Sequence, residues 1–341
     1  MYNVGMYGGS FNPLHMGHVD CILKAAGMCK ELYIVLSIGY KRDEVDERVR
    51  YRWLYQLTKH IGNVKIITIT DDAQTKAGYE KEHWMKDAAD VKAQIGKKID
   101  IVFCGSDYDE SSFWNVCYPE SELYIFPRNG ISSTEIRKNP FAHWDWIPQV
   151  ARPYYTKKVL IVGIESTGKS TLTIHLAHRF NAEYIDEAGR ELSERSGTDT
   201  MMLPEDYTEI LLQHKLNEMK AIERGNRLLF IDTDALITRF FMDFLDGEDP
   251  RIEKNRVLAD AVDALNRYDL ILYMEPDVEF YMDGGRSAEI RDNREKYSSR
   301  IKELFRSHGR DFTCISGDYK ERYEKAVAEV KKLIGEEQDP E

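Results

Sequence analysis

Short apolar runs alternate with longer amphipathic stretches along the whole chain. Val19, Ile22, Leu23 and Ala26, for example, recur at the spacing of one helix face. Runs rich in β-branched and aromatic residues predict strands at residues 2–7, 32–36, 64–70, 99–104 and 123–126, and again at 159–162, 183–185, 228–231 and 270–273. Strands that alternate with helices form parallel sheets covered on both faces. The pattern therefore predicts an α/β protein with two doubly wound parallel-sheet domains in series.

A segment rich in proline and aromatic residues separates the two series of strands. Pro140, Pro148 and Pro153 each disfavour helix at the residue before them. We place the boundary at Pro148, so the predicted domains are residues 1–148 and 149–341. A flexible linker would be polar, whereas this segment is aromatic, so we expect it to pack between the domains. Its aromatic residues are Phe141, Trp144, Trp146, Tyr154 and Tyr155.

Composition narrows the classes of protein that this pattern allows. The chain has 341 residues, enough for two hydrophobic cores. Its net charge of -12 disfavours general nucleic-acid binding, because phosphate contacts dominate that affinity. We see no signal peptide, no membrane-spanning run and no CxxC pair among the five cysteines. We expect a cytoplasmic protein that binds neither nucleic acid nor membrane, and a homo-oligomer is compatible with this composition.

A glycine-rich turn with two histidines follows the first predicted strand. The run GGSFNPLHMGH, residues 8–18, leads directly into a helix. Backbone N–H groups and a helix N-terminus favour phosphate there, and two imidazoles can stabilise charge on a phosphate in transition. The same spacing could mark a metal pair or two surface histidines, but no further metal ligands accompany it. The candidate ATP contacts are Gly8, Gly9, Ser10, Phe11, His15 and His18, the last two also catalytic.

Three further segments supply candidates for the same domain. The run ISSTEIR, residues 131–137, could hold ATP phosphates or could simply begin a helix with a capping box of Ser132 and Glu135. Its candidate contacts are Ser132, Ser133, Thr134 and Arg137. Ligands of open α/β sheets bind at the carboxyl ends of strands. That position is occupied by Gly105 and Asp107, while Arg48, Arg50 and Trp53 are either substrate contacts or a basic helix face with a packed Trp.

The second domain opens with a phosphate-binding loop. The run GIESTGKS, residues 163–170, follows an apolar strand, opens a helix and fits GxxxxGK[ST]. In such loops the backbone amides cradle phosphates, the lysine reaches the β- and γ-phosphates, and the serine binds Mg²⁺. The predicted ATP contacts are Gly163, Glu165, Ser166, Thr167, Gly168, Lys169, Ser170 and Thr171.

Acidic groups and a later glycine pair complete the predicted second site. Asp232 and Asp234 end a strand, where they suit the Mg²⁺ shell or the acceptor. Asp186 and Glu187 end the strand before it and could accept the proton of an attacking hydroxyl, or cap a helix. The run DGGRS, residues 283–287, is either a plain turn or a lid that brings arginines to the phosphate. The lid candidates are Arg286, Arg291 and Arg294, and the acceptor candidates are Asp186, Glu187, Arg190 and Asp234.

Two sets of motifs carry a resemblance that covers nearly the whole chain. GGSFNPLHMGH and ISSTxxR resemble the signatures of nicotinamide-mononucleotide adenylyltransferases, within the HxGH nucleotidylyltransferase superfamily. GIESTGKS, FIDTD and DGGRS are similar to the ribosylnicotinamide kinase domain of the NadR family, which carries both domains in this order. The resemblance implies a Rossmann-like adenylyltransferase domain followed by a P-loop kinase domain.

The activities that this resemblance implies belong to NAD biosynthesis and salvage. The kinase would phosphorylate nicotinamide riboside with ATP, and the adenylyltransferase would join nicotinamide mononucleotide and ATP to give NAD and pyrophosphate. ATP is the implied co-substrate of both steps. Mg²⁺ is the implied cofactor, held in the kinase by Ser170 and Asp232.

Two departures and two alternatives accompany the resemblance. The first strand starts at residue 2, so we expect no helix-turn-helix repressor domain ahead of it. The family's Trp-Glu-Tyr-x-Arg run is DEAGR here, residues 186–190, and lacks both aromatics. A fused pantetheine-phosphate adenylyltransferase and dephospho-coenzyme A kinase shares the architecture, although its adenylyltransferases usually have TxGH in place of HMGH. A non-enzymatic nucleotide sensor would carry broken sites, whereas His15, His18, Lys169, Ser170 and Asp232 are intact.

Overall fold

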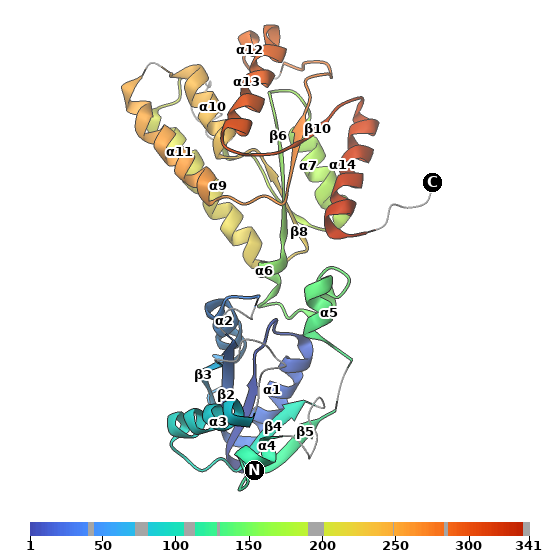
Figure 1. Ribbon diagram of the computed structural model, residues 1–341. Helices are drawn as coiled ribbons and strands as arrows, with labels where there is room; N and C mark the ends of the chain where they lie inside the picture. The colour runs from blue at the N-terminus through green and yellow to red at the C-terminus, as the bar shows by residue number, and fades with distance from the viewer. Residues whose placement is uncertain are drawn as a thin grey trace. The chain divides into compact units, whose positions relative to one another are not determined.

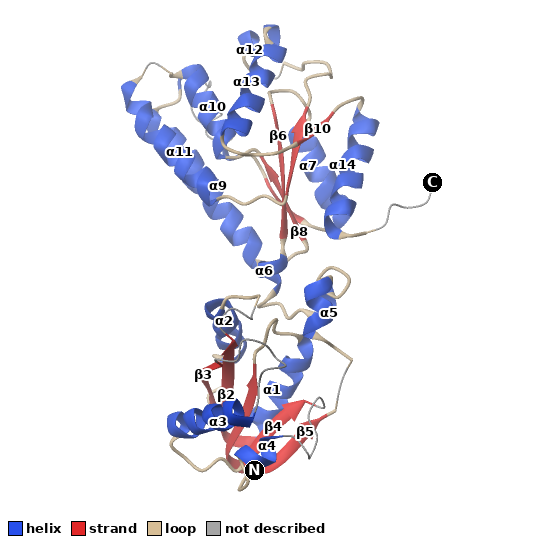
Figure 2. Ribbon diagram, in the orientation of Figure 1, coloured by secondary structure: helices blue, strands red, loops and turns tan. Residues whose placement is uncertain are grey.

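The computed structural model describes residues 1–39, 44–71, 81–105, 113–127, 130–189, 201–247, 249–282 and 286–336. The chain forms two compact units, Met1–Arg152 and Pro153–Glu341 (Figure 1). Each unit contains a five-stranded sheet in which the paired strands are all parallel. Helices flank the strands of each unit (Figure 2). The predicted α/β class, with two parallel sheets in series, is confirmed.

The sheet of the first unit has the strand order β3-β2-β1-β4-β5. Its strands are β1 (Tyr2–Gly9), β2 (Cys29–Gly39), β3 (Val64–Asp71), β4 (Ile101–Gly105) and β5 (Glu122–Phe126). The described helices are α1 (Met16–Met28), α2 (Glu47–Thr58), α3 (Lys81–Ile95), α4 (Phe113–Cys117) and α5 (Ser133–Lys138). Helices α3 and α4 share a hydrophobic core with one face of the sheet. Leu23, predicted on the buried face of α1, is 46% exposed, and Ala25 completes that face instead.

The sheet of the second unit has the strand order β10-β9-β6-β8-β7. Its strands are β6 (Lys157–Gly163), β7 (Glu183–Ile185), β8 (Leu228–Asp232), β9 (Leu270–Met274) and β10 (Thr313–Ile315). The described helices of this half are α6 (Arg152–Tyr155), α7 (Lys169–Phe180), α9 (Pro204–Glu223), α10 (Ala235–Leu245), α11 (Glu253–Leu265), α12 (Ala288–Asp292), α13 (Arg294–Ser307) and α14 (Tyr319–Ile334). One face of the sheet packs against α10 and α13, while α7 and α14 lie together on the other side of it (Figure 1).

Both predicted phosphate-binding turns follow a central strand. Strand β1 lies between β2 and β4, and β6 lies between β8 and β9. In each sheet the chain order therefore reverses beside that strand, which is where open α/β sheets leave a crevice at their carboxyl ends. The motif beginning at Gly8 and the loop beginning at Gly163 are thus both located where this fold binds ligands.

The predicted linker is ordered around its aromatic residues. A 3-10 turn covers Trp144–Trp146, and the ring of Trp144 stacks on Phe141 with centroids 5.7 Å apart. Both rings are buried. Within the described part of the chain, no helix combines the length and the apolar character that crossing a membrane requires.

Candidate active sites

The two histidines of the first motif form a stacked pair at the start of α1. His15 is the N-cap residue: its Nδ1 accepts from the His18 N–H at 3.3 Å, and His18 Nδ1 accepts from the His15 N–H at 3.3 Å. Their ring centroids are 3.6 Å apart, with 16° between the planes. Phe11, at φ 48°, sets its ring edge-on against His18 at 5.0 Å. Both imidazoles therefore lie together at the predicted phosphate-binding turn.

These hydrogen bonds decide which nitrogens carry protons. A neutral imidazole has one N–H and one acceptor nitrogen, and here Nδ1 is the acceptor in both rings. Nε2–H is therefore the side-chain donor of His15 and of His18. Burial and the neighbouring His15 lower the pKa of His18 well below its usual value. Around neutral pH the pair consequently offers two neutral donors, a suitable arrangement for a phosphate whose charge is increasing.

The depressed pKa of His18 predicts a pH-dependent stability. Below pH 6.5 the unfolded chain takes up a proton that the folded site resists, so the folded state loses about 1.4 kcal/mol per pH unit. This loss is absent above the unfolded pKa and ends at the folded pKa. We expect His18→Gln to lose less stability than the wild type between pH 7 and 5.5, measured by thermal unfolding. His60→Gln, an exposed position in the same unit, should follow the wild type, and identical pH curves for all three proteins would refute the assignment.

The second motif of this unit contacts the first directly. Ser133 Oγ donates to the Pro13 carbonyl at 3.1 Å, and the Arg137 guanidinium donates to the Asn12 carbonyl and to Thr134 Oγ1. Ser132 caps α5 through the Thr134 N–H. The other half of the predicted capping box is replaced, because Glu135 pairs with Lys138 at 2.9 Å. Two motifs more than a hundred residues apart thus form one site.

The basic residues of α2 differ in their roles. Arg50 is 1% exposed and donates to three backbone carbonyls: Ser10 at 2.6 Å, Val45 at 2.9 Å and Ser37 at 3.2 Å. It therefore braces the glycine-rich turn, which corrects its interpretation as a substrate contact or an exposed basic residue.

The other predicted substrate contacts of this unit are spread more widely. Arg48 is largely exposed and pairs with Asp46, while Trp53 is buried. Gly105 ends β4 with open space where a side chain would be. Asp107 lies outside the described residues.

The loop of the second unit has the backbone that a phosphate cradle requires. At Gly163 φ is 152°, and a Cβ would come within 2.7 Å of the Met274 carbonyl. Gly168, with φ 83°, is the N-cap residue of α7. The Lys169 ammonium donates to the Ile164 carbonyl at 3.1 Å, which holds it over the loop. Both glycines are thus required by geometry, and the lysine is positioned where phosphates would bind.

The segment after β9 reaches back to this loop. Ser166 Oγ accepts from the Tyr281 N–H at 2.8 Å and from Arg286 Nη1 at 2.9 Å. Glu165 accepts from the Ser287 N–H at 3.2 Å. Arg286 is therefore held against the phosphate-binding loop, and its role in a lid stays a prediction. The glycines of DGGRS lie outside the described residues.

The other two lid candidates are not equivalent. Arg291 pairs with the adjacent Asp292 at 2.8 Å and is half exposed. Arg294 instead donates to the loop carbonyls of Ser166 at 2.7 Å and Glu165 at 3.3 Å. Of the two, the structure brings Arg294 to the loop.

A third arginine, from the last helix, also supports the loop. Arg322 of α14 is 1% exposed and donates to the Thr167 carbonyl at 2.7 Å, to the Gly317 and Glu275 carbonyls, and to Asp277. It is separated from Thr167 by 155 residues in sequence, so the spacing of motifs gives no sign of it. The last helix is thereby attached to the phosphate-binding loop.

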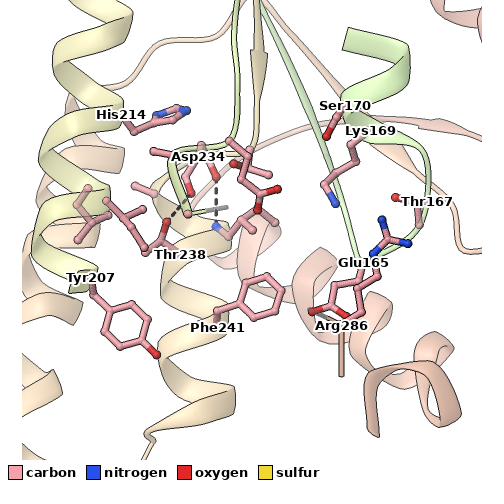
Figure 3. Close-up of a pocket in the computed structure, with 18 of the residues that line it drawn as sticks. Glu165, Thr167, Lys169, Ser170, Tyr207, His214, Asp234, Thr238, Phe241 and Arg286 are labelled. Atoms are coloured by element: carbon pink, nitrogen blue, oxygen red, sulfur yellow. Dashed lines mark hydrogen bonds between the residues drawn. The ribbon is translucent and has the colours of Figure 1, made fainter. Parts of the chain in front are cut away.

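A cavity of about 620 Å³ extends from this loop between α9 and α10. The predicted residues Glu165 to Thr171, Glu187, Asp234 and Arg286 line it, as Figure 3 shows for several of them. Tyr207 and Phe241 also line it, although the sequence analysis missed them. They supply aromatic surface that the DEAGR run lacks. Their helical spacing in sequence could not be distinguished from that of ordinary core residues.

The four acidic candidates occupy different environments. Asp232 ends β8 and is 1% exposed. Asp234 caps α10, accepting from the Leu236 and Ile237 N–H groups at 3.1 and 3.3 Å. Glu187 lines the cavity, whereas Asp186 is exposed and outside its lining. Arg190 lies outside the described residues.

The donor set near the loop suits a hard cation. Ser170 is the second residue of α7 and lines the cavity. Asp232 provides carboxylate oxygens at the end of β8, the strand beside β6. Hydroxyl and carboxylate oxygens are the ligands that Mg²⁺ takes together with nucleotide phosphates. Among the described residues, no three His, Cys, Asp or Glu side chains cluster as a metal site of their own.

Two family models match the chain, one in each of its two units. The family model described as "Cytidylyltransferase-like" matches residues 6–139, and the model described as "AAA domain" matches residues 158–322. With the sites above, they define the class: a nucleotidyltransferase-type α/β domain followed by a nucleotide-binding P-loop domain.

Relatives from two bacteria match nearly the whole chain. The chain is 28% identical to "Trifunctional NAD biosynthesis/regulator protein NadR" of Escherichia coli (strain K12), over 98% of this chain and 84% of that one. The protein of the same name from Salmonella typhimurium matches equally well, with 28% identity over 98% of this chain. The chain is therefore similar to the NadR proteins over 98% of its length.

One solved structure and one shorter relative complete the comparison. A "Crystal structure of NadR protein in complex with NR" has a TM-score of 0.79, covering 100% of this chain and 98% of that one, and at 23% identity it shows a shared fold. The "Phosphopantetheine adenylyltransferase" of Mycoplasma capricolum is 27% identical but covers only 36% of this chain. The relative that represents the alternative coenzyme A function thus matches little more than a third of the chain.

Proposed function

We propose that this chain is a bifunctional enzyme that makes NAD in two steps. The second unit phosphorylates nicotinamide riboside with ATP, and the first joins the resulting nicotinamide mononucleotide to a second ATP, releasing pyrophosphate. The observation that carries the proposal is the match to NadR proteins over 98% of the chain, with both nucleotide sites intact. Neither a fused coenzyme A enzyme nor a sensor accounts for that combination.

In the adenylyltransferase step, the protein acts by positioning and by stabilising charge. An oxygen of the mononucleotide phosphate attacks the α-phosphorus of ATP, and the bond to the β-phosphate breaks as pyrophosphate leaves. His15 and His18 donate Nε2–H to the phosphate whose charge increases. Arg137, Ser133 and Thr134 stand beside them and bind the departing β- and γ-phosphates. No side-chain nucleophile is needed.

In the kinase step, the 5′-hydroxyl oxygen of the riboside attacks the γ-phosphorus and ADP leaves. Lys169 and Arg286 neutralise the charge on the transferring group. Ser170 and Asp232 would hold Mg²⁺, which when bound adds positive charge at the β- and γ-phosphates. Glu187, the member of the acidic pair that lines the cavity, accepts the hydroxyl proton.

The assignment of the base makes a prediction about the acidic pair. Glu187→Gln removes the proton acceptor but keeps the side-chain shape, so kcat for riboside phosphorylation should fall by about 10². Asp186→Asn is the matched control, because Asp186 is adjacent and exposed. Steady-state kinetics with riboside and ATP measures both variants. A collapse in Asp186→Asn with Glu187→Gln active would transfer the role of base to Asp186.

A product assay with the purified chain tests the whole proposal. Incubation with ATP and nicotinamide riboside should give the mononucleotide, ADP, NAD and pyrophosphate. Incubation with ATP and the mononucleotide should give NAD and pyrophosphate without ADP. Phosphopantetheine in place of the mononucleotide should give no adenylylated product. Product from phosphopantetheine, with none from the pyridine compounds, would establish the competing function.

A further inference from the structure

The wall of the cavity away from the phosphate-binding loop is mostly apolar. Tyr207, Ile210, Leu211 and His214 line it from one face of α9. In Figure 3 His214 extends from α9, while Asp234 lies at the N-terminal end of α10 and Thr238 lies on α10 itself. The Tyr207 hydroxyl already donates to Asp246 Oδ2 at 2.7 Å. The polar groups of this wall are therefore chiefly His214, Asp234 and Thr238, which we call the polar end of the cavity.

His214 presents a hydrogen-bond acceptor at this polar end. Its side chain is 7% exposed, and its Nε2 has no hydrogen-bond partner among the described residues. The ring is hydrogen-bonded to the backbone of Asp232. A neutral imidazole that donates from Nδ1 to a backbone carbonyl keeps a lone pair on Nε2. A ligand that reaches this nitrogen must bring a donor.

Asp234 presents a second acceptor. Its Oδ1 is satisfied by two N–H groups of α10, but Oδ2 is buried and has no partner among the described residues. A buried carboxylate oxygen without a donor is costly. A ligand with N–H donors or a positive charge would offset that cost.

Resting on the proposed riboside kinase activity, we propose that His214 and Asp234 read the base of the acceptor nucleoside and select a pyridinium carboxamide over the corresponding carboxylate. The carboxamide brings N–H donors on a positively charged ring, which matches two acceptors, one of them acidic. A carboxylate brings only acceptors and a negative charge, so it leaves both side chains unsatisfied. Sites built around a substrate N–H reject analogues without it strongly.

The test compares nicotinamide riboside with nicotinate riboside as kinase substrates. The wild type should prefer the amide by at least about 10² in kcat/KM. Asp234→Asn removes the charge and adds donors while keeping a residue that caps helices equally well. His214→Gln adds a donor by an independent route. Each variant should lower the amide-to-acid ratio by about tenfold or more, mainly through KM.

Controls separate this inference from the proposed function. Asp243→Asn makes the same chemical change at an exposed position of the same helix and should keep the wild-type ratio. Thermal unfolding and kcat with saturating nicotinamide riboside report whether each variant is folded. Equal use of both ribosides by the wild type would overturn the inference, as would variants that weaken both substrates in proportion. If neither riboside is phosphorylated, the proposed kinase function fails and the inference fails with it.

Discussion

His18→Ala is expected to lower the rate of NAD formation from nicotinamide mononucleotide and ATP by about 10²–10³, since that is the usual effect of removing one preorganised donor to a charged transition state. The structure adds a reason for a loss at the upper end. His18 Nδ1 also accepts from the His15 N–H, and the two rings are stacked, so the substitution also removes a backbone hydrogen bond and the stacking contact of His15. Initial rates of pyrophosphate release measure the effect.

The same protein carries its own control. Phosphorylation of nicotinamide riboside occurs in the other unit and should remain near its starting rate in His18→Ala. His60→Ala changes an exposed histidine of the first unit and should leave both rates unchanged. If NAD synthesis by His18→Ala is near normal, the motif is not the adenylyltransferase site.

Lys169→Ala is expected to have the reciprocal effect, with riboside phosphorylation reduced on the order of 10³ and adenylyl transfer from supplied mononucleotide retained. The ammonium is held over the loop by the Ile164 carbonyl, and alanine leaves the cradle without that positive charge. Release of ADP with riboside as the acceptor measures the kinase step.

Lys320→Ala is the matched control, since this lysine is 81% exposed on α14. It should leave both activities intact. If both activities of Lys169→Ala fell together while thermal unfolding stayed unchanged, the model of two independent sites would be wrong.

Most of the fold could be predicted because its strands and helices follow local patterns of apolar and polar residues. Nine of the strands follow apolar runs that are visible in sequence, whereas β10 was missed. It has only three residues, Thr313–Ile315, and the first of them is polar. So short a run carries no periodicity, and it becomes a strand only by pairing with β9.

The sites were predicted less evenly, and the reason is the range of the contacts. Loops that bind phosphate are contiguous, so Gly8 to His18 and Gly163 to Ser170 could be found by spacing. Arg50 and Arg322 act through backbone carbonyls far away in sequence, and arginines are ordinarily expected at the surface. His214 lies on a helix with no motif around it, and only the cavity gives it a role.

The hydrogen bond from Arg322 to the phosphate-binding loop has a consequence for folding during synthesis on the ribosome. Domains generally fold as units as the chain emerges, the N-terminal one first. The first unit contains both of its motifs within residues 1–152, so it can complete its site while the rest is being translated. The loop at Thr167 obtains its buried support only when residue 322 arrives. A nascent chain should therefore gain the ability to form NAD well before it can phosphorylate a riboside, and one released before α14 would keep only the earlier activity.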